Sequence, residues 1–196
     1  MADRRLILDV DLDGVCGDFY GCMREIFSEY AEIPLEQIPV ADSFSLNCWG
    51  IQTRQDYEDF HRFAVTQKNL FSIMPIMPGA RKYLRKLSDE GVRIRIVTHR
   101  LCIKYFHKEA VVQTVEWLEK NGIPFWDLCF LKSKTDIYAD AFIEDTPHNI
   151  DALRKLGVYT ICFANSTNID VSNPRAESWE EVYNLVKERE QCIKFS

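Results

Sequence analysis

The stretch Leu6-Ile-Leu-Asp-Val-Asp-Leu-Asp-Gly-Val-Cys-Gly-Asp-Phe19 decides the fold prediction for this chain. Its apolar run from Leu6 to Val10 predicts a buried strand, and acids follow at Asp11 and Asp13. Buried charge is costly, so acids at a strand end indicate a metal ion or a cationic partner. In open α/β sheets, ligands bind at the carboxyl ends of strands. The stretch therefore predicts a functional site, and the alternative is an Asx-rich turn.

The segment Asp11-Leu-Asp13-Gly-Val15 resembles the first motif of the haloacid dehalogenase (HAD) superfamily. That resemblance implies that Asp11 attacks a phosphoryl group and that Asp13 acts as the general acid and base. Gly14 suits a backbone turn that approaches a ligand closely. The short motif alone is only moderately specific, so the rest of the chain has to supply the other parts of such a site.

Composition limits the classes of protein that fit. The 196 residues suit one domain with an insertion, and a net charge of −6 with scattered Lys and Arg argues against a nucleic-acid polymer as partner. No apolar run approaches the ~20 residues of a membrane span. The predicted first strand begins near the first residue, so no signal or transit peptide is expected. Seven cysteines without C-x-x-C spacing indicate reduced thiols and a cytoplasmic protein.

After about residue 76, strand and helix patterns alternate, which predicts a parallel sheet with helices on both faces, a Rossmann-like α/β fold. Thr146 suits an N-cap and Pro147 a first helical position. Ser178 and Glu181 form a capping-box pattern that opens a C-terminal helix. The other predicted elements are helices over 79–90, 106–120 and 147–156, and strands over 92–97, 128–131, 141–143 and 158–163.

Residues 18–75 interrupt this alternation. They contain two helical stretches, 19–31 and 56–67, and many aromatic residues, but no convincing parallel strand. The pattern predicts a small, mainly helical cap inserted into a core that consists of residues 1–17 and 76–196. Most of its rings are expected to form the core of the cap, and rings near the joins either do the same or face a substrate.

Three further clusters follow predicted strands in the order that a HAD enzyme requires. By that resemblance, Thr98 and Lys134 bind phosphate, and the acids Glu144 and Asp145 complete a metal site with Asp11. Mg²⁺ prefers oxygen ligands of this kind. Each residue also has a structural interpretation: Thr98 as a turn residue, Lys134 as a solvated lysine, and the two acids as favourable charges at a helix N-terminus.

A closer resemblance is to the 5'(3')-deoxyribonucleotidases. The segment from Lys134 to Asp145 is similar to their K-T-x-x-x-x-D-x-x-I-D-D, and that from Asp11 to Phe19 is similar to D-M-D-G-V-L-A-D-F. The resemblance implies metal ligands at Asp11, Asp13 and Asp145, and it implies that Phe19 lines the nucleotide pocket. The family's T-S-P is replaced by Thr98-His99-Arg100, and its first Asp of D-D by Glu144. The remaining assignments are His99 to phosphate, Arg100 and Trp49 to the substrate pocket, and Glu144 to the metal.

These observations together predict a Mg²⁺-dependent phosphomonoesterase that forms an aspartyl-phosphate on Asp11. The expected substrate is a small phosphorylated molecule, a nucleoside monophosphate and first of all a deoxy one. Two alternatives stay open: a phosphatase for another phosphorylated metabolite, and a catalytically silent binding or regulatory protein. The sequence leaves both a monomer and a homodimer open.

Overall fold

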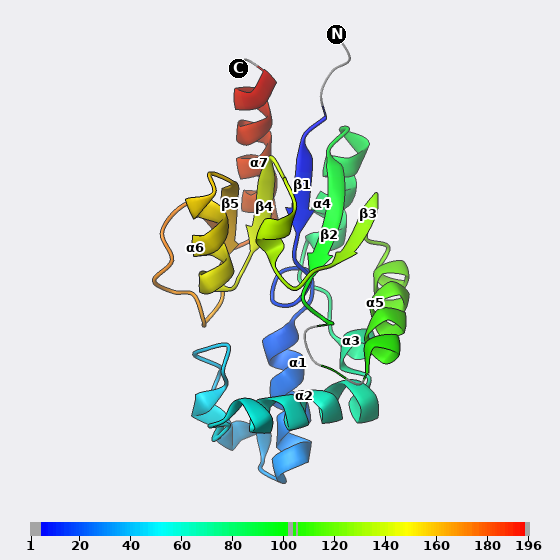
Figure 1. Ribbon diagram of the computed structural model, residues 1–196, viewed down its shortest axis with the longest axis vertical. Coiled ribbons are helices and arrows are strands. Elements are labelled where there is room, and N and C mark those ends of the chain that lie inside the picture. Colours follow the sequence, from blue (N-terminus) through cyan, green and yellow to red (C-terminus); the bar gives the residue numbers. More distant parts are fainter. Residues whose placement is uncertain (1–4, 102–103, 105, 195–196) are drawn as a thin grey trace.

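The computed structural model describes residues 5–101, 104 and 106–194, and Figure 1 shows their arrangement. One sheet of six parallel strands has the order β3-β2-β1-β4-β5-β6. This confirms the predicted parallel α/β fold. The strands are β1 (Ile7–Val10), β2 (Arg93–Thr98), β3 (Asp127–Phe130), β4 (Ala141–Glu144), β5 (Tyr159–Phe163) and β6 (Arg175–Ala176).

Helices cover both faces of the sheet. Successive strand residues point to opposite sides, so both faces carry apolar side chains that have to be buried. Ile96 and Ile143 belong to the main buried cluster, whereas their neighbours Val97 and Phe142 belong to a second, smaller one. The main cluster includes residues of α4 (Ala80–Asp89), α5 (His107–Asn121) and α7 (Trp179–Lys194), and the second includes Leu153 of α6 (Pro147–Lys155).

The structure agrees with the predicted first residues of helices α6 and α7, with one difference in the hydrogen bonds at α7. Pro147 is the first residue of α6 after Thr146, as expected. At α7, Ser178 Oγ accepts a hydrogen bond from the Glu181 N–H at 3.3 Å. The Glu181 carboxylate, however, accepts from the N–H of Glu177 at 2.7 Å, so the reciprocal half of the capping box lies one residue earlier than the pattern predicts.

Residues 18–75 are helical and contain no strand. Trp49 stacks on Phe27 with ring centroids 5.3 Å apart, and Phe60 meets the Phe27 ring edge-on at 5.1 Å. Rings of this segment therefore form a small core of their own, as expected for most of them. The elements are α1 (Phe19–Ala31), α2 (Arg54–Lys68) and α3 (Leu70–Ile73), with single 3₁₀ turns η1 (Leu35–Gln37) and η2 (Asn47–Trp49).

The two connections between the sheet and residues 18–75 pair with each other. The N–H of Asp18 donates to Pro75 O and that of Met77 donates to Cys16 O, both at 2.8 Å. Two buried indoles fix these connections: Trp179 Nε1 donates to Val15 O at 3.1 Å, and Trp117 Nε1 donates to Met74 O at 2.6 Å. The loop that carries Asp13 is thus held from both sides. That residues 18–75 form a separate domain stays a prediction.

Two further expectations concern membranes and thiols. Among helices in the described ranges, none has the length and apolar character that crossing a membrane requires. Six of the seven cysteines are free thiols, and Cys102 lies outside the described residues.

Candidate active site

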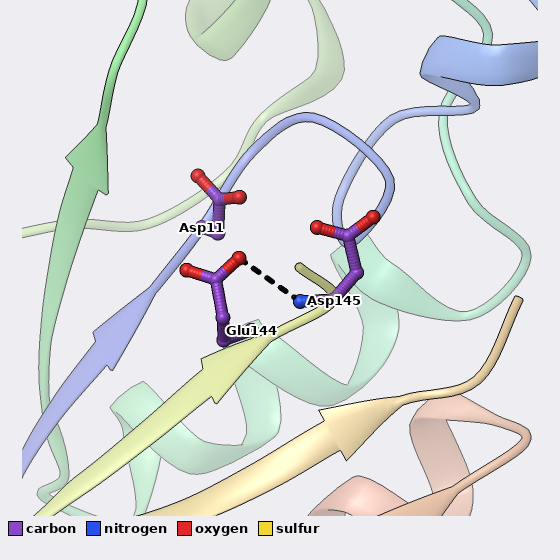
Figure 2. A group of neighbouring side chains, drawn as sticks. All are labelled: Asp11, Glu144 and Asp145. Atoms are coloured by element: carbon purple, nitrogen blue, oxygen red, sulfur yellow. Dashed lines mark hydrogen bonds between the residues drawn. The ribbon is translucent and has the colours of Figure 1, made fainter. Parts of the chain in front are cut away.

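The ends of β1 and β4 bring three carboxyl groups together (Figure 2). Asp11 directly follows β1, and its N–H donates to Ile143 O of β4 at 3.0 Å, which continues the ladder between the strands. Carboxylate oxygens of Asp11, Glu144 and Asp145 lie within 4.8 Å of one another, and all three residues are buried. The structure therefore unites the acids predicted at these two strand ends.

Lys134 supplies a positive charge inside this group. It lies in the 3₁₀ turn η3 (Lys134–Asp136), is 3% exposed, and places Nζ 2.7 Å from Asp11 Oδ1 and 2.6 Å from Glu144 Oε2. Burial disfavours its charged form, but the carboxylates of Asp11 and Glu144 outweigh burial and raise the pKa of Lys134. Lys134 is therefore a buried ammonium and not a solvated loop lysine, and its contact with phosphate stays a prediction.

The Glu144 carboxylate accepts three hydrogen bonds. Besides its contact with Lys134, its Oε1 accepts from the N–H groups of Asp145 at 3.1 Å and Thr146 at 3.0 Å (Figure 2 draws the first of these). Burial raises the pKa of Glu144, but the charge of Lys134 outweighs this effect and holds the pKa below its usual value. This arrangement suits a carboxylate that fixes Lys134 better than one that is free to bind a metal.

Within the described residues Asp145 has no ion-pair partner, and the charge of Lys134 offsets its surroundings only in part. Burial, the charge of Glu144 and that of Asp11 raise its pKa well above the usual value. Its oxygens accept from neutral donors, Asn165 Nδ2 at 2.8 Å and Thr146 Oγ1 at 3.2 Å. Gly14 passes so close that a Cβ there would lie 2.2 Å from Asp145 Oδ2. Three carboxyl groups thus share Lys134 among the described residues, and the uncompensated charge fits a divalent cation.

Burial also acts on Asp11. It raises the pKa of Asp11 to about 7, against the opposing effect of the Lys134 charge. A bound cation would favour the ionised carboxylate, because opposite charge stabilises the charged form of an acid.

Asp13 has a different partner. The guanidinium of Arg100 forms a two-pronged ion pair with it, with Nη2 at 2.6 Å from Oδ1 and Nε at 3.0 Å from Oδ2. The structure therefore brings Arg100 to the pocket, as expected, but directs its charge to Asp13. With this pairing, the Asp13 side chain is not placed as a metal ligand.

Thr98 is the last residue of β2, and His99 follows it near the charge of Lys134. Thr98 is fully buried, and within the described part of the chain its Oγ1 has no hydrogen-bond partner. The same holds for His99 Nε2. Burial, assisted by the Lys134 charge, lowers the pKa of His99. Buried polar atoms are normally hydrogen-bonded, so each of these two can take a further partner, and His99 is among the residues that line a pocket.

A pocket of about 220 Å³ lies above these groups. Its polar wall includes Asp11, Asp13, His99, Lys134 and Asp145 of the sheet's loops. Its aromatic wall comes from residues 18–75 and consists of Phe19, Tyr20, Phe44, Tyr57, His61 and Phe71. One side of the pocket thus offers charge for a phosphoryl group, and the other offers flat apolar surfaces.

Phe19 lines this pocket as predicted, whereas Trp49 does not. Trp49 packs on Phe27 in the helical segment, and its Nε1 donates to Pro39 O at 2.9 Å. The assignment of Trp49 to the substrate pocket is thus corrected. The sequence did not predict how the segment around Trp49 is oriented, so it could not show which way this ring faces.

The residues that line the pocket and were not predicted as site residues are Tyr20, Phe44, Tyr57, His61, Phe71, Thr146 and Asn149. Tyr57 and His61 stack with centroids 5.7 Å apart on α2. Their spacing of four residues places both on one helix face, and this was the available signal. Asn165 was missed as well, although it follows β5 at the same edge of the sheet as Asp11 and Asp145.

Comparisons with known proteins show which family this chain belongs to. The family model described as "5' nucleotidase, deoxy (Pyrimidine), cytosolic type C protein" matches residues 5–191. The chain belongs to this nucleotidase family. A relative from Chlorobaculum tepidum, named "Putative 5'(3')-deoxyribonucleotidase", is 56% identical over 187 residues, which cover 95% of this chain and 93% of the relative.

Solved structures place the nucleotidase among HAD hydrolases by fold. A predicted phosphatase from Clostridium acetobutylicum superposes with a TM-score of 0.62 at 14% identity, covering 94% of this chain and 99% of that one. The magnesium-bound HAD-hydrolase YfnB from Bacillus subtilis gives 0.61 at 15% identity, covering 93% and 99%. The predicted HAD fold and the predicted class, a HAD-type nucleotide phosphatase, are confirmed.

Proposed function

We propose that the protein is a Mg²⁺-dependent phosphomonoesterase that hydrolyses nucleoside monophosphates, deoxyribonucleoside monophosphates first among them. The observation that carries the proposal is the position of Asp11. Its carboxylate lies on the polar wall of the pocket, 2.7 Å from the buried ammonium of Lys134 and beside Asp145. A nucleophile, a cation for the phosphoryl oxygens and a site for a divalent ion therefore converge on one point.

Asp11 attacks phosphorus through a carboxylate oxygen. As this P–O bond forms, the bond from phosphorus to the alcohol oxygen breaks, and Asp13 gives its proton to the leaving alkoxide. A water oxygen then attacks the aspartyl-phosphate, Asp13 takes a proton from that water, and Asp11 leaves as the free carboxylate. Lys134 and Thr98 donate hydrogen bonds to the phosphoryl oxygens, where charge develops.

Asp11 and Asp145 are the residues that would hold Mg²⁺, with the backbone carbonyl of Asp13 as a further oxygen ligand. When bound, the ion neutralises phosphoryl oxygens and the local excess of carboxylates. Glu144 contributes by holding Lys134 in place.

The aromatic wall of the pocket supports a nucleoside as the group attached to phosphate. Flat rings such as Phe19 and Tyr57 supply large contact areas and tolerate different bases. The free thiols of the described cysteines support a cytoplasmic location.

The test is a panel of phosphorylated metabolites assayed with Mg²⁺, using the wild type and Asp11→Asn. We expect turnover of nucleoside monophosphates and a loss of at least about 10³-fold in Asp11→Asn, because removing a nucleophile removes the covalent route. Efficient hydrolysis of sugar phosphates but of no nucleotide would leave only the general phosphatase. Near-normal activity of Asp11→Asn would show that Asp11 is not the nucleophile.

A further inference from the structure

Arg100 is a buried arginine at the pocket, and each of its three guanidinium nitrogens donates a hydrogen bond to the protein. Its side chain is 0% exposed, whereas that of Asp13 is 23% exposed. Nε and Nη2 donate to the two oxygens of Asp13, and Nη1 donates to Thr114 Oγ1 of α5 at 3.0 Å. The guanidinium also lies over the Phe71 ring, 4.0 Å from its centroid. These contacts hold the planar group from its edges and from one face.

This geometry argues against the expected contact between Arg100 and substrate. A guanidinium carries its donors in a fixed fork. Here the fork is already filled by Asp13, and the remaining nitrogen is bonded to Thr114. A substrate anion could reach these donors only after Asp13 had left them.

The pair instead fixes the direction of Asp13. Asp13 lies in a turn after the strand, and Gly14 continues this turn with a positive φ of 79°. Two parallel N–H···O contacts from an immobile guanidinium determine both its position and the plane of its oxygens. Asp11 has its own cation, Lys134, so among the described residues each of the two acids is held by a separate cation.

We propose that Arg100 is a positioning residue for the acid and base Asp13, anchored by Thr114 and Phe71, and that it does not bind substrate. The inference rests on the phosphomonoesterase proposed above. Proton transfer requires the donor to lie within hydrogen-bond reach of the alkoxide oxygen. Without Arg100, the Asp13 carboxylate turns freely toward solvent, and the proton reaches the leaving group less often.

The experiment compares two leaving groups in Arg100→Met. Thymidine 5'-monophosphate releases an alkoxide that needs a proton, whereas p-nitrophenyl phosphate releases a phenolate that does not. We expect single-turnover cleavage of the nucleotide to slow at least about tenfold, a part of what general acid catalysis contributes. The first burst of p-nitrophenolate should stay nearly unchanged, followed by a slower steady state, because Asp13 must still activate water. KM for the nucleotide should stay the same.

Arg95→Met is the matched control. Arg95 forms the same kind of two-pronged pair with buried Asp9, at 2.7 and 2.9 Å, in the middle of β1 and β2 and outside the pocket. Its loss should lower the unfolding temperature, as Arg100→Met should, without any difference between the leaving groups. If Arg100→Met does not fold, Arg100→Lys tests the same point, since it keeps a cation but not the fork.

Three results would overturn the inference. A raised KM with unchanged kcat in Arg100→Met would make Arg100 a substrate contact. Equal losses on both substrates would make the pair part of the general scaffold, and wild-type kinetics on both would make it irrelevant to the reaction. A wild type that hydrolyses neither substrate with Mg²⁺ would instead refute the phosphomonoesterase, and this inference with it.

Discussion

Lys134 and Glu144 form a buried ion pair with Nζ 2.6 Å from Oε2, and neither side chain is more than 3% exposed. The pair connects the third loop of the site to the end of β4. The same ammonium lies 2.7 Å from Asp11 Oδ1, so Lys134 bridges the two acids. The proposed phosphate-binding cation is therefore positioned by an acid that the sequence suggested as a metal ligand.

Glu144→Gln should lower both stability and activity. The amide keeps the shape of the side chain but removes the charge opposite Lys134, and breaking a buried pair costs about 3 kcal/mol. Urea unfolding and kcat measure the two effects. Glu36→Gln, at an exposed position, is the control and should change neither quantity. A fully active Glu144→Gln of wild-type stability would contradict the proposed role of the pair.

Thr98→Val should separate stability from activity. The Thr98 hydroxyl is buried without a partner in the described residues, so its removal relieves a polar-burial cost of about 1 kcal/mol. If the hydroxyl serves the phosphoryl group, kcat should fall at the same time by about tenfold, the value of one charge-assisted hydrogen bond. Calorimetry and steady-state kinetics on one preparation decide the matter. A valine variant that is as active as the wild type would return Thr98 to a purely structural role.

His61 should make the fold sensitive to acid. Burial lowers its pKa from 6.5 to about 4, so the unfolded chain binds a proton between these values and the folded protein does not. Stability from this group is present above pH 6.5 and is lost as the pH falls toward 4, on the order of 3 kcal/mol in all. His61→Phe fits the same aromatic surroundings and should lack this loss. Unfolding free energies at pH 7.5 and pH 5 should diverge between the two proteins; parallel behaviour would show that His61 is not buried in the neutral form.

Metal binding should be visible in stability as well as in activity. A chelator should abolish turnover and Mg²⁺ should restore it. An ion that binds only the folded state also stabilises that state. Mg²⁺ should also raise the unfolding temperature of the wild type, but not that of Asp145→Asn, which loses a proposed ligand. In chelator the variant should be at least as stable as the wild type, since it removes an uncompensated buried acid. Full activity in excess chelator would refute the metal site.

Phe19→Ala and Trp49→Ala test which rings face the substrate. Both side chains are buried, so each truncation should destabilise the protein by about 3 kcal/mol. Only Phe19 lines the pocket. Its loss should raise KM for thymidine 5'-monophosphate about tenfold, as expected for a lost stacking contact. KM for p-nitrophenyl phosphate should hardly change. The same KM shift in Trp49→Ala would return Trp49 to the substrate site.

The sheet and its acids could be predicted because strand ends carry their own signal. An apolar run followed by Asp11, and another followed by Glu144 and Asp145, must meet at one edge once the strands are parallel. Side-chain direction had no such signal. Arg100 follows Thr98 by two residues, and nothing in the sequence shows that it turns to Asp13. The two-residue strand β6 and the four-residue helix α3 are too short to leave a periodic pattern.

The paired connections at Cys16–Met77 and Asp18–Pro75 have an evolutionary consequence. Residues 18–75 leave and re-enter the core at one short ladder. Their number and internal arrangement therefore do not have to match the pairing of the strands. Side chains outside the ladder also hold this segment, among them Gln113, which donates to Val65 O, Trp117, which donates to Met74 O, and Ser166, which donates to Ala41 O. Substitution at such docking points would let a lineage exchange the whole insert, and with it the leaving group that is recognised, while the phosphoryl-transfer chemistry is inherited unchanged.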